Sequence, residues 1–119
     1  MAVNIGEFFN MDEAQKKQAI QAYKLAPVEY GVIQIENTIN HKRFIAVVPN
    51  IKNRWFFYQT NLNRGAYHDT DFQRDWDEMG ASAFAYLVLW HKKTDDVVNM
   101  RAELKNLKAE WIEKIHPEY

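Results

Sequence analysis

The chain has 119 residues, 47% of them apolar and 14% aromatic, with a formal net charge of −1 at pH 7 and no cysteine. This length suits one compact domain that buries its own core. Because the chain has no cysteine, disulfides and thiolate metal sites are excluded. Its net charge is near zero, whereas most dedicated DNA-binding proteins have an excess of basic residues. A local basic patch is compatible with that balance.

Three absences bear on where the protein works. No apolar stretch approaches the roughly 20 residues of a membrane-spanning helix. The N-terminus lacks the basic and apolar regions of a signal peptide, and a chain without cysteine suits a reducing compartment. We expect a soluble cytoplasmic protein with no membrane partner.

The first predicted element is a helix. Asp12-Glu13-Ala14-Gln15 has the pattern of a capping box, good helix formers follow as far as Leu25, and Pro27 ends the segment. We therefore expect residues 1–27 to form an N-terminal helical extension and residues 28–119 to form the main domain.

Two strands and a turn come next. Residues 32–36 alternate β-branched and polar side chains, and residues 43–48 form a second β-rich run. Asn40-His41 between them is typical of a turn, so the pair is predicted as an antiparallel hairpin. Pro49 ends the second strand, and Asn50 is predicted as the N-cap of a helix that runs to about residue 62.

The second half contains a short helix, a third strand and a long helix. Thr70-Asp71-Phe72-Gln73 predicts a capped helix through residue 78, with Gly80 in the left-handed position after it. Residues 84–90 predict an apolar strand and residues 97–115 an amphipathic helix. The order predicts a small α+β domain with three strands, two of them a hairpin, and helices packed around them.

The segment after the turn carries a family motif. Phe44-Ile45-Ala46-Val47-Val48-Pro49-Asn50-Ile51-Lys52-Asn53-Arg54 resembles the second strand and the arginine-bearing helix of the GIY-YIG nucleases, and Gly31-Val32-Ile33 resembles their first strand. The resemblance runs from Tyr30 to Lys114, and its downstream part is similar to a bacterial subgroup. It implies a three-stranded antiparallel sheet flanked by helices and, in active members, Mg²⁺-dependent cleavage of phosphodiesters.

The resemblance assigns reactive positions that this chain has largely lost. The tyrosines of the family's two strands correspond to Ile33 and Phe44, which have no hydroxyl to exchange a proton, and the following glycine corresponds to Ala46. Arg54 matches the arginine that stabilises developing phosphate charge, and Tyr58 replaces a frequent histidine while keeping a hydroxyl. Arg54 and Tyr58 are therefore the candidate catalytic residues.

The metal-binding glutamate of the family corresponds to Lys108. An ammonium group repels a hard cation such as Mg²⁺, which prefers carboxylate oxygen, and neighbouring positions on the same helix face hold no acid. We therefore expect no metal site and no cofactor. Lys108 either meets a phosphate or an acid of the sheet such as Glu36, or it covers the edge of the core and keeps its amine in water.

Basic and aromatic side chains around the motif indicate a binding surface. The candidate nucleic-acid contacts, which either line one electropositive groove or pair with nearby acids, are Lys42, Arg43, Lys52, Arg54 and Arg64. Trp55, Phe56, Phe57 and Tyr58 are consecutive on a predicted helix, so one core face cannot bury all four rings. Exposed rings would suit base stacking or a protein partner, unless the N-terminal helix covers them.

The remaining titratable residues give weaker signals. Four histidines lie in turns and near termini without the spacing of metal ligands, so they are interpreted as surface residues. Asp71 favours the positive end of the predicted helix, while Asp69, Asp75 and Asp77 are interpreted as a solvated face.

Three functions fit these residues. The leading interpretation is a GIY-YIG-like protein, catalytically impaired or inactive, that keeps weak binding of DNA or RNA. An alternative is a module for binding a protein partner or for homo-oligomerisation on the same scaffold, which the near-zero charge favours. A metal-dependent DNA endonuclease with a rebuilt site is the third, so whether the protein is an enzyme stays open.

Overall fold

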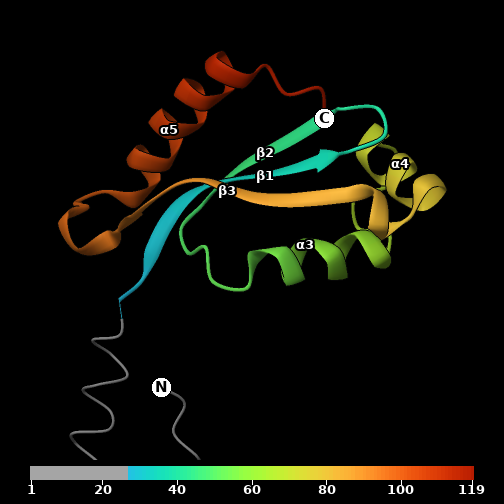
Figure 1. Cartoon of the computed structure of the whole chain (residues 1–119). Coiled ribbons are helices and arrows are strands. Elements are labelled where there is room, and N and C mark those ends of the chain that lie inside the picture. The colour runs from blue at the N-terminus through green and yellow to red at the C-terminus, as the bar shows by residue number, and fades with distance from the viewer. Residues whose placement is uncertain (1–26) are drawn as a thin grey trace, which may run out of the picture.

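The computed structural model describes residues 27–119 (Figure 1). The elements are β1 (Glu29–Asn37), β2 (Arg43–Val48), α3 (Arg54–Asn63), α4 (Asp71–Met79), β3 (Phe84–Lys93) and α5 (Met100–Ile115), with short 3-10 turns at Ala81–Ala83 and Thr94–Asp96. The helix predicted over residues 12–25 lies outside the described residues. Within them, no helix is long and apolar enough to cross a membrane.

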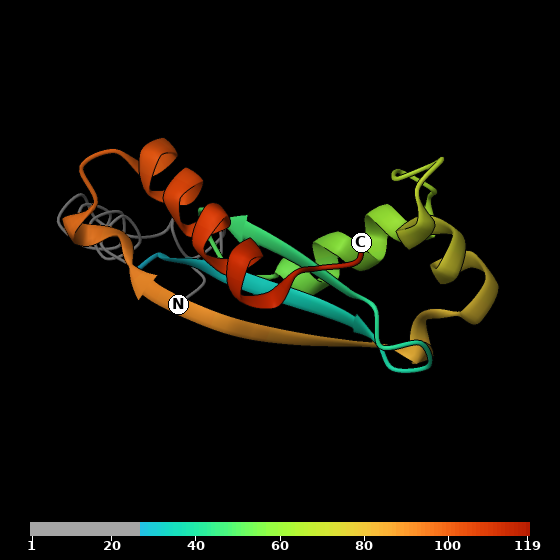
Figure 2. The same ribbon diagram turned by 90° about the horizontal axis from the view of Figure 1, so that it is seen from above.

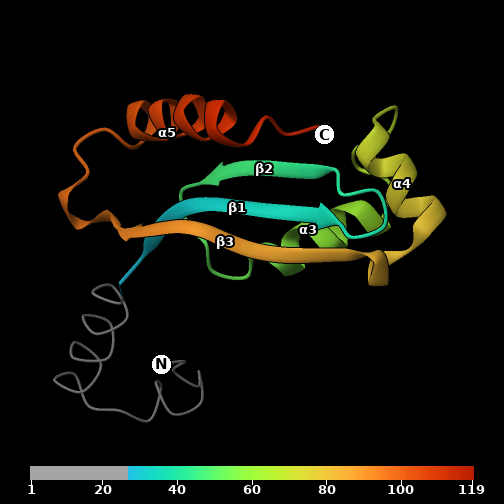
Figure 3. The same ribbon diagram turned by 45° about the horizontal axis from the view of Figure 1, so that its top comes forward.

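The three strands form one antiparallel sheet in the order β2-β1-β3, which is followed most easily in Figure 3. The predicted hairpin of β1 and β2 is confirmed, with Ile33 opposite Ala46 and Ile35 opposite Phe44. β3 pairs with the whole length of β1 and shifts register between Val32 and Ile33. β1 is therefore the central strand, and β2 is an edge strand.

Helices cover both faces of the sheet. In Figure 1, α3 lies on one side of the sheet and α5 on the other, while α4 lies beyond one end of the strands. Figure 2, seen from above, shows α5 over the sheet and α4 at that same end. Alternate residues of each strand point to opposite faces, so each face has its own core. The core under α3 and α4 is built around Ile33, Ile35, Leu62, Phe72, Trp76 and Phe84, and that under α5 around Tyr30, Val32 and Leu107. The expected α+β architecture is thus present.

Gly31 lies where β1 and β3 approach closely. A Cβ atom at this position would collide with the backbone carbonyl oxygen of Trp90 and would crowd Ile51. Strand backbone cannot move aside without breaking the ladder, so this position requires glycine. The first glycine of the family motif therefore has a packing reason here.

The helix boundaries confirm some predictions and correct others. The N-cap of α4 is confirmed, because the Thr70 hydroxyl accepts from the Gln73 N–H at 3.2 Å. The reciprocal bond of a capping box is absent, because the Gln73 side chain accepts from the Tyr67 N–H instead, and Gly80 follows with φ 83° and an extended ψ of 160°. The predicted N-cap at Asn50 is wrong: α3 begins at Arg54, after Asn53 with φ 59°. The cause is tertiary, because the Ile51 N–H donates to the Glu29 carbonyl at 2.9 Å and holds this segment against β1 as a turn.

Candidate nucleic-acid interface

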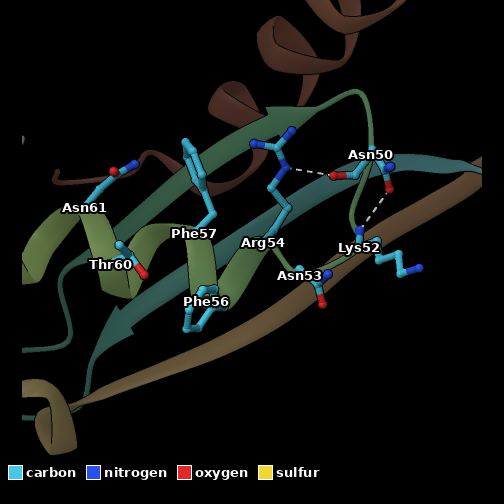
Figure 4. Close-up of a pocket in the computed structure, with 8 residues that line it drawn as sticks. All are labelled: Asn50, Lys52, Asn53, Arg54, Phe56, Phe57, Thr60 and Asn61. Carbon is cyan, nitrogen blue, oxygen red and sulfur yellow. Dashed lines mark hydrogen bonds between the residues drawn. The ribbon is translucent and has the colours of Figure 1, made fainter. Parts of the chain in front are cut away.

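A groove of about 450 Å³ lies along the start of α3 (Figure 4). Eight residues line it: Asn50, Lys52, Asn53, Arg54, Phe56, Phe57, Thr60 and Asn61. Two are cations, none is an acid, and the others provide amides, a hydroxyl and two aromatic rings. The lining therefore favours an anionic ligand that carries flat apolar groups.

The turn before α3 positions the polar side of the groove. The Asn50 side-chain oxygen accepts from the Lys52 N–H at 3.0 Å, and the Asn50 carbonyl accepts from Arg54 Nε at 2.8 Å. Both contacts are drawn in Figure 4. Nε therefore bonds to the turn, and among residues 27–119 no group accepts from the terminal nitrogens of Arg54, which provide four of the five donors of a guanidinium.

Arg54 is half-buried among aromatic groups. Its guanidinium carbon lies 5.0 Å from the centre of the Phe57 ring, within range of a cation–π interaction. None of the ion pairs between described residues involves Arg54. An arginine that is held in place but has no acidic partner can present its charge to a phosphate.

The four consecutive aromatic residues divide between core and solvent. Tyr58 is buried, and Trp55 stacks on Tyr86 with ring centres 5.4 Å apart. Phe56 is 71% exposed and Phe57 45% exposed, and both line the groove. The prediction that one core face cannot bury all four rings is confirmed, and the two exposed rings stand beside Arg54.

Tyr58 keeps the hydroxyl noted in the sequence but is poorly suited to proton transfer. Burial raises the pKa of Tyr58 to about 12, and neighbouring Tyr67 acts in the same direction, while the charge of Arg54 opposes them. Its phenol is therefore protonated at neutral pH. Because it packs edge-on against Phe44, with ring centres 5.5 Å apart, Tyr58 is part of the core.

The positions that correspond to the family's other reactive groups are apolar and packed. Ile33 is fully buried, and the half-buried Phe44 stacks on Phe72 with ring centres 4.6 Å apart. Ala46 pairs with Ile33 across the hairpin and packs against the same core. These side chains face α3, on the same side of the sheet as Arg54, but they supply hydrocarbon where proton transfer needs a hydroxyl.

The predicted basic residues are only partly brought together. Lys52 and Arg54 share the groove. Arg43 instead donates to the Ile115 carbonyl at 2.9 Å and pairs with Glu118, and Lys42 lies 5.8 Å from the centre of the Tyr119 ring. Arg64 follows the far end of α3. A nucleic-acid role for the three residues outside the groove stays a prediction.

Lys108 projects from α5, on the opposite face of the sheet from α3, and is exposed. The groove offers amide and hydroxyl oxygens but no carboxylate, and a hard divalent cation needs carboxylates. Among residues 27–119, no three His, Cys, Asp or Glu side chains gather at a potential metal site. The lining of the groove therefore lacks the carboxylate that a Mg²⁺ site prefers, and the absence of a metal stays a prediction.

Asp69 and Asp77 are exposed as predicted, but Asp75 differs from its interpretation as part of a solvated face. Asp75 is buried, because the Tyr119 hydroxyl and Asn40 Nδ2 both donate to its carboxylate. Gln73 is buried as well and donates to the Leu62 carbonyl at 2.7 Å. Asp75 is therefore buried by the hairpin turn and by the residue that ends the chain after α5, contacts that are remote in sequence.

Comparisons with known proteins support the fold. No family model matches the chain, and no curated protein matches it. Among solved structures, a mutant of the catalytic domain of intron endonuclease I-TevI is similar, with 20% identity and a TM-score of 0.61 over 74% of this chain and 84% of that chain. That domain is a GIY-YIG nuclease. The chain therefore has a GIY-YIG-like fold, a nuclease-like scaffold.

Proposed function

We propose that this protein binds single-stranded nucleic acid through the α3 groove without cleaving it. The observation that carries the proposal is the groove itself, which places two cations beside two exposed phenylalanine rings. Cations neutralise phosphates, and aromatic rings stack on unpaired bases with about 1–3 kcal/mol per base. The fully paired bases of a duplex are not free to stack in this way, so single strands fit the groove better.

Loss of catalysis is the second half of the proposal. Ile33 and Phe44 provide no proton-transfer group, Tyr58 is protonated in the core, and the groove lining holds no carboxylate. Arg54 alone can stabilise developing charge, but it cannot activate water. The chain therefore keeps the arginine that contacts phosphate and lacks the side chains that activate water for attack on it.

Binding is tested by fluorescence anisotropy with a labelled single strand of about 20 nucleotides. Each neutralised phosphate contributes about 0.7 to the salt slope on a single strand, which equals about fivefold in affinity at 0.1 M salt. Arg54→Ala should therefore weaken binding at least about fivefold and flatten the slope. Arg74→Ala removes the same charge from an exposed ion pair with Asp71 and serves as the control.

Wild-type protein that does not bind, or that binds equally well at low and high salt, would end this proposal. Catalysis is tested separately with supercoiled plasmid and Mg²⁺ or Mn²⁺. We expect no relaxed or linear product. Nicking that disappears in Arg54→Ala would instead establish a working endonuclease.

The exposed rings also favour a second function, docking of a protein partner. Phe56 is the most exposed of the four rings and extends away from the core. Phe56→Ser should weaken nucleic-acid binding if the ring stacks on bases. Unchanged nucleic-acid binding, together with loss of self-association in sedimentation analysis, would assign the ring to a protein interface.

A further inference from the structure

A row of basic side chains runs along α5, outside the groove. Arg101, Lys105 and Lys108, named here the α5 stripe, are spaced four and three residues apart and so share one helix face. They extend over about 10 Å of helix at 1.5 Å per residue. All three are exposed, and none joins an ion pair with another described residue.

The contacts of α5 fix the direction in which the stripe faces. Glu103, on the opposite flank of the helix, accepts from the Tyr30 hydroxyl of β1 at 3.1 Å. α5 packs mainly over β2, and the carbonyl of its last residue, Ile115, accepts from Arg43 of that strand. The stripe therefore faces outward on the side of β2, the edge strand.

The α3 groove opens toward the same edge. Trp55 stacks on Tyr86 of β3, which turns that flank of α3 away from β2. Arg54, Phe57 and Asn61 lie on the other flank, at three- and four-residue spacing. Figure 4 shows Arg54 and Phe57 rising beside β2. Two basic surfaces thus border one sheet edge, one on each face.

We propose that the α5 stripe is a second phosphate-binding surface, so that one nucleic-acid strand passes around the β2 edge from the α3 groove to α5. This inference rests on the proposed function and extends it to a surface that contains the lysine in the place of the family's metal-binding glutamate. An unpaired basic row attracts a polyanion, and its position at the same sheet edge as a groove suited to bases favours nucleic acid over acidic polypeptide.

The test compares two lysines of the stripe with a third lysine of the same helix that lies outside it. Lys108→Gln should lower affinity for the single strand about fivefold at 0.1 M salt and reduce the salt slope by about 0.7. The double variant Lys105→Gln/Lys108→Gln should lower affinity about 25-fold and reduce the slope by about 1.4. Lys114→Gln is the matched control, because Lys114 pairs with Glu110 on the other flank at 2.9 Å, and its effect should stay below about twofold.

The outcomes separate this inference from the proposed function. If the double variant binds with wild-type affinity and Arg54→Ala binds more weakly, the α5 stripe does not bind phosphate, and the proposed binding in the α3 groove is retained. No binding by wild-type protein, or binding that Arg54→Ala leaves unchanged, would overturn both. Competition by a polyglutamate peptide as strong as that by the unlabelled strand would refute the assignment to nucleic acid. Circular dichroism melts check that the exposed substitutions leave the fold intact.

Discussion

The hydroxyl of Tyr119 is predicted to stabilise the fold by holding a buried carboxylate. It donates to Asp75, which is 9% exposed, and accepts from Asn37 Nδ2 at 3.1 Å. Its ring stacks on Phe72 with centres 5.0 Å apart. Tyr119→Phe keeps the stack and removes only the hydroxyl. A hydrogen bond to a charged group contributes about 1.5–3 kcal/mol, so the variant should lose about 2 kcal/mol of unfolding free energy.

Urea unfolding followed by tryptophan fluorescence measures this loss at neutral pH. The midpoint should fall while the denaturant slope stays unchanged, because the surface exposed on unfolding is the same. Glu110→Gln is the control, since Glu110 forms only an exposed ion pair with Lys114, worth at most about 1 kcal/mol. An equal midpoint for Tyr119→Phe and wild type would refute the reasoning, because it would mean that water satisfies Asp75 equally well.

Two further predictions concern the packing of the site. Gly31→Ala should destabilise the protein more than Gly65→Ala, by over about 2 kcal/mol in urea unfolding, because the first drives a Cβ into strand backbone and the second costs only the left-handed strain of φ 75°. Equal losses would contradict the close approach of β1 and β3. Burial raises the pKa of Tyr58 to about 12 from about 10, so its contribution to stability is complete below pH 10 and is lost as pH rises through 12. Raising pH from about 8 to about 11 should cost wild type about 1 kcal/mol more than Tyr58→Phe, and an equal loss in both would place that hydroxyl in solvent.

Elements with complete local signals could be predicted from the sequence. The N-cap at Thr70, the alternation in β1 and the apolar spacing of α5 each lie within one stretch of chain, and each led to the observed element. The start of α3 could not be predicted, because the Glu29 carbonyl holds the turn from a distant strand. The length of β3 beyond residue 90 depends on pairing with β1 in the same way.

The sequence predicted the central residue of the candidate site, but it did not predict which neighbouring side chains line the groove. The motif pointed to Arg54, and four rings on one helix implied that some would reach solvent. Which rings do so depends on the rotation of α3 against the sheet, which the packing of Trp55 between Tyr86 and Trp76 determines. The burial of Asp75 likewise depends on Tyr119, which is 44 residues away in the chain.

The proposed function depends on the charge of Lys108, the residue that the resemblance matches to the metal-binding glutamate of the family. A carboxylate on α5 favours a cation at the β2 edge, and a lysine at the same position favours an anion. Arg101 and Lys105 add positive charge along α5, and Arg54 and Lys52 place positive charge on the opposite face of the sheet. A surface with this charge attracts a phosphate backbone but cannot concentrate the divalent cation that hydrolysis in this kind of scaffold requires. Under the proposed function, binding and cleavage depend on different side chains of one scaffold, so binding does not require cleavage.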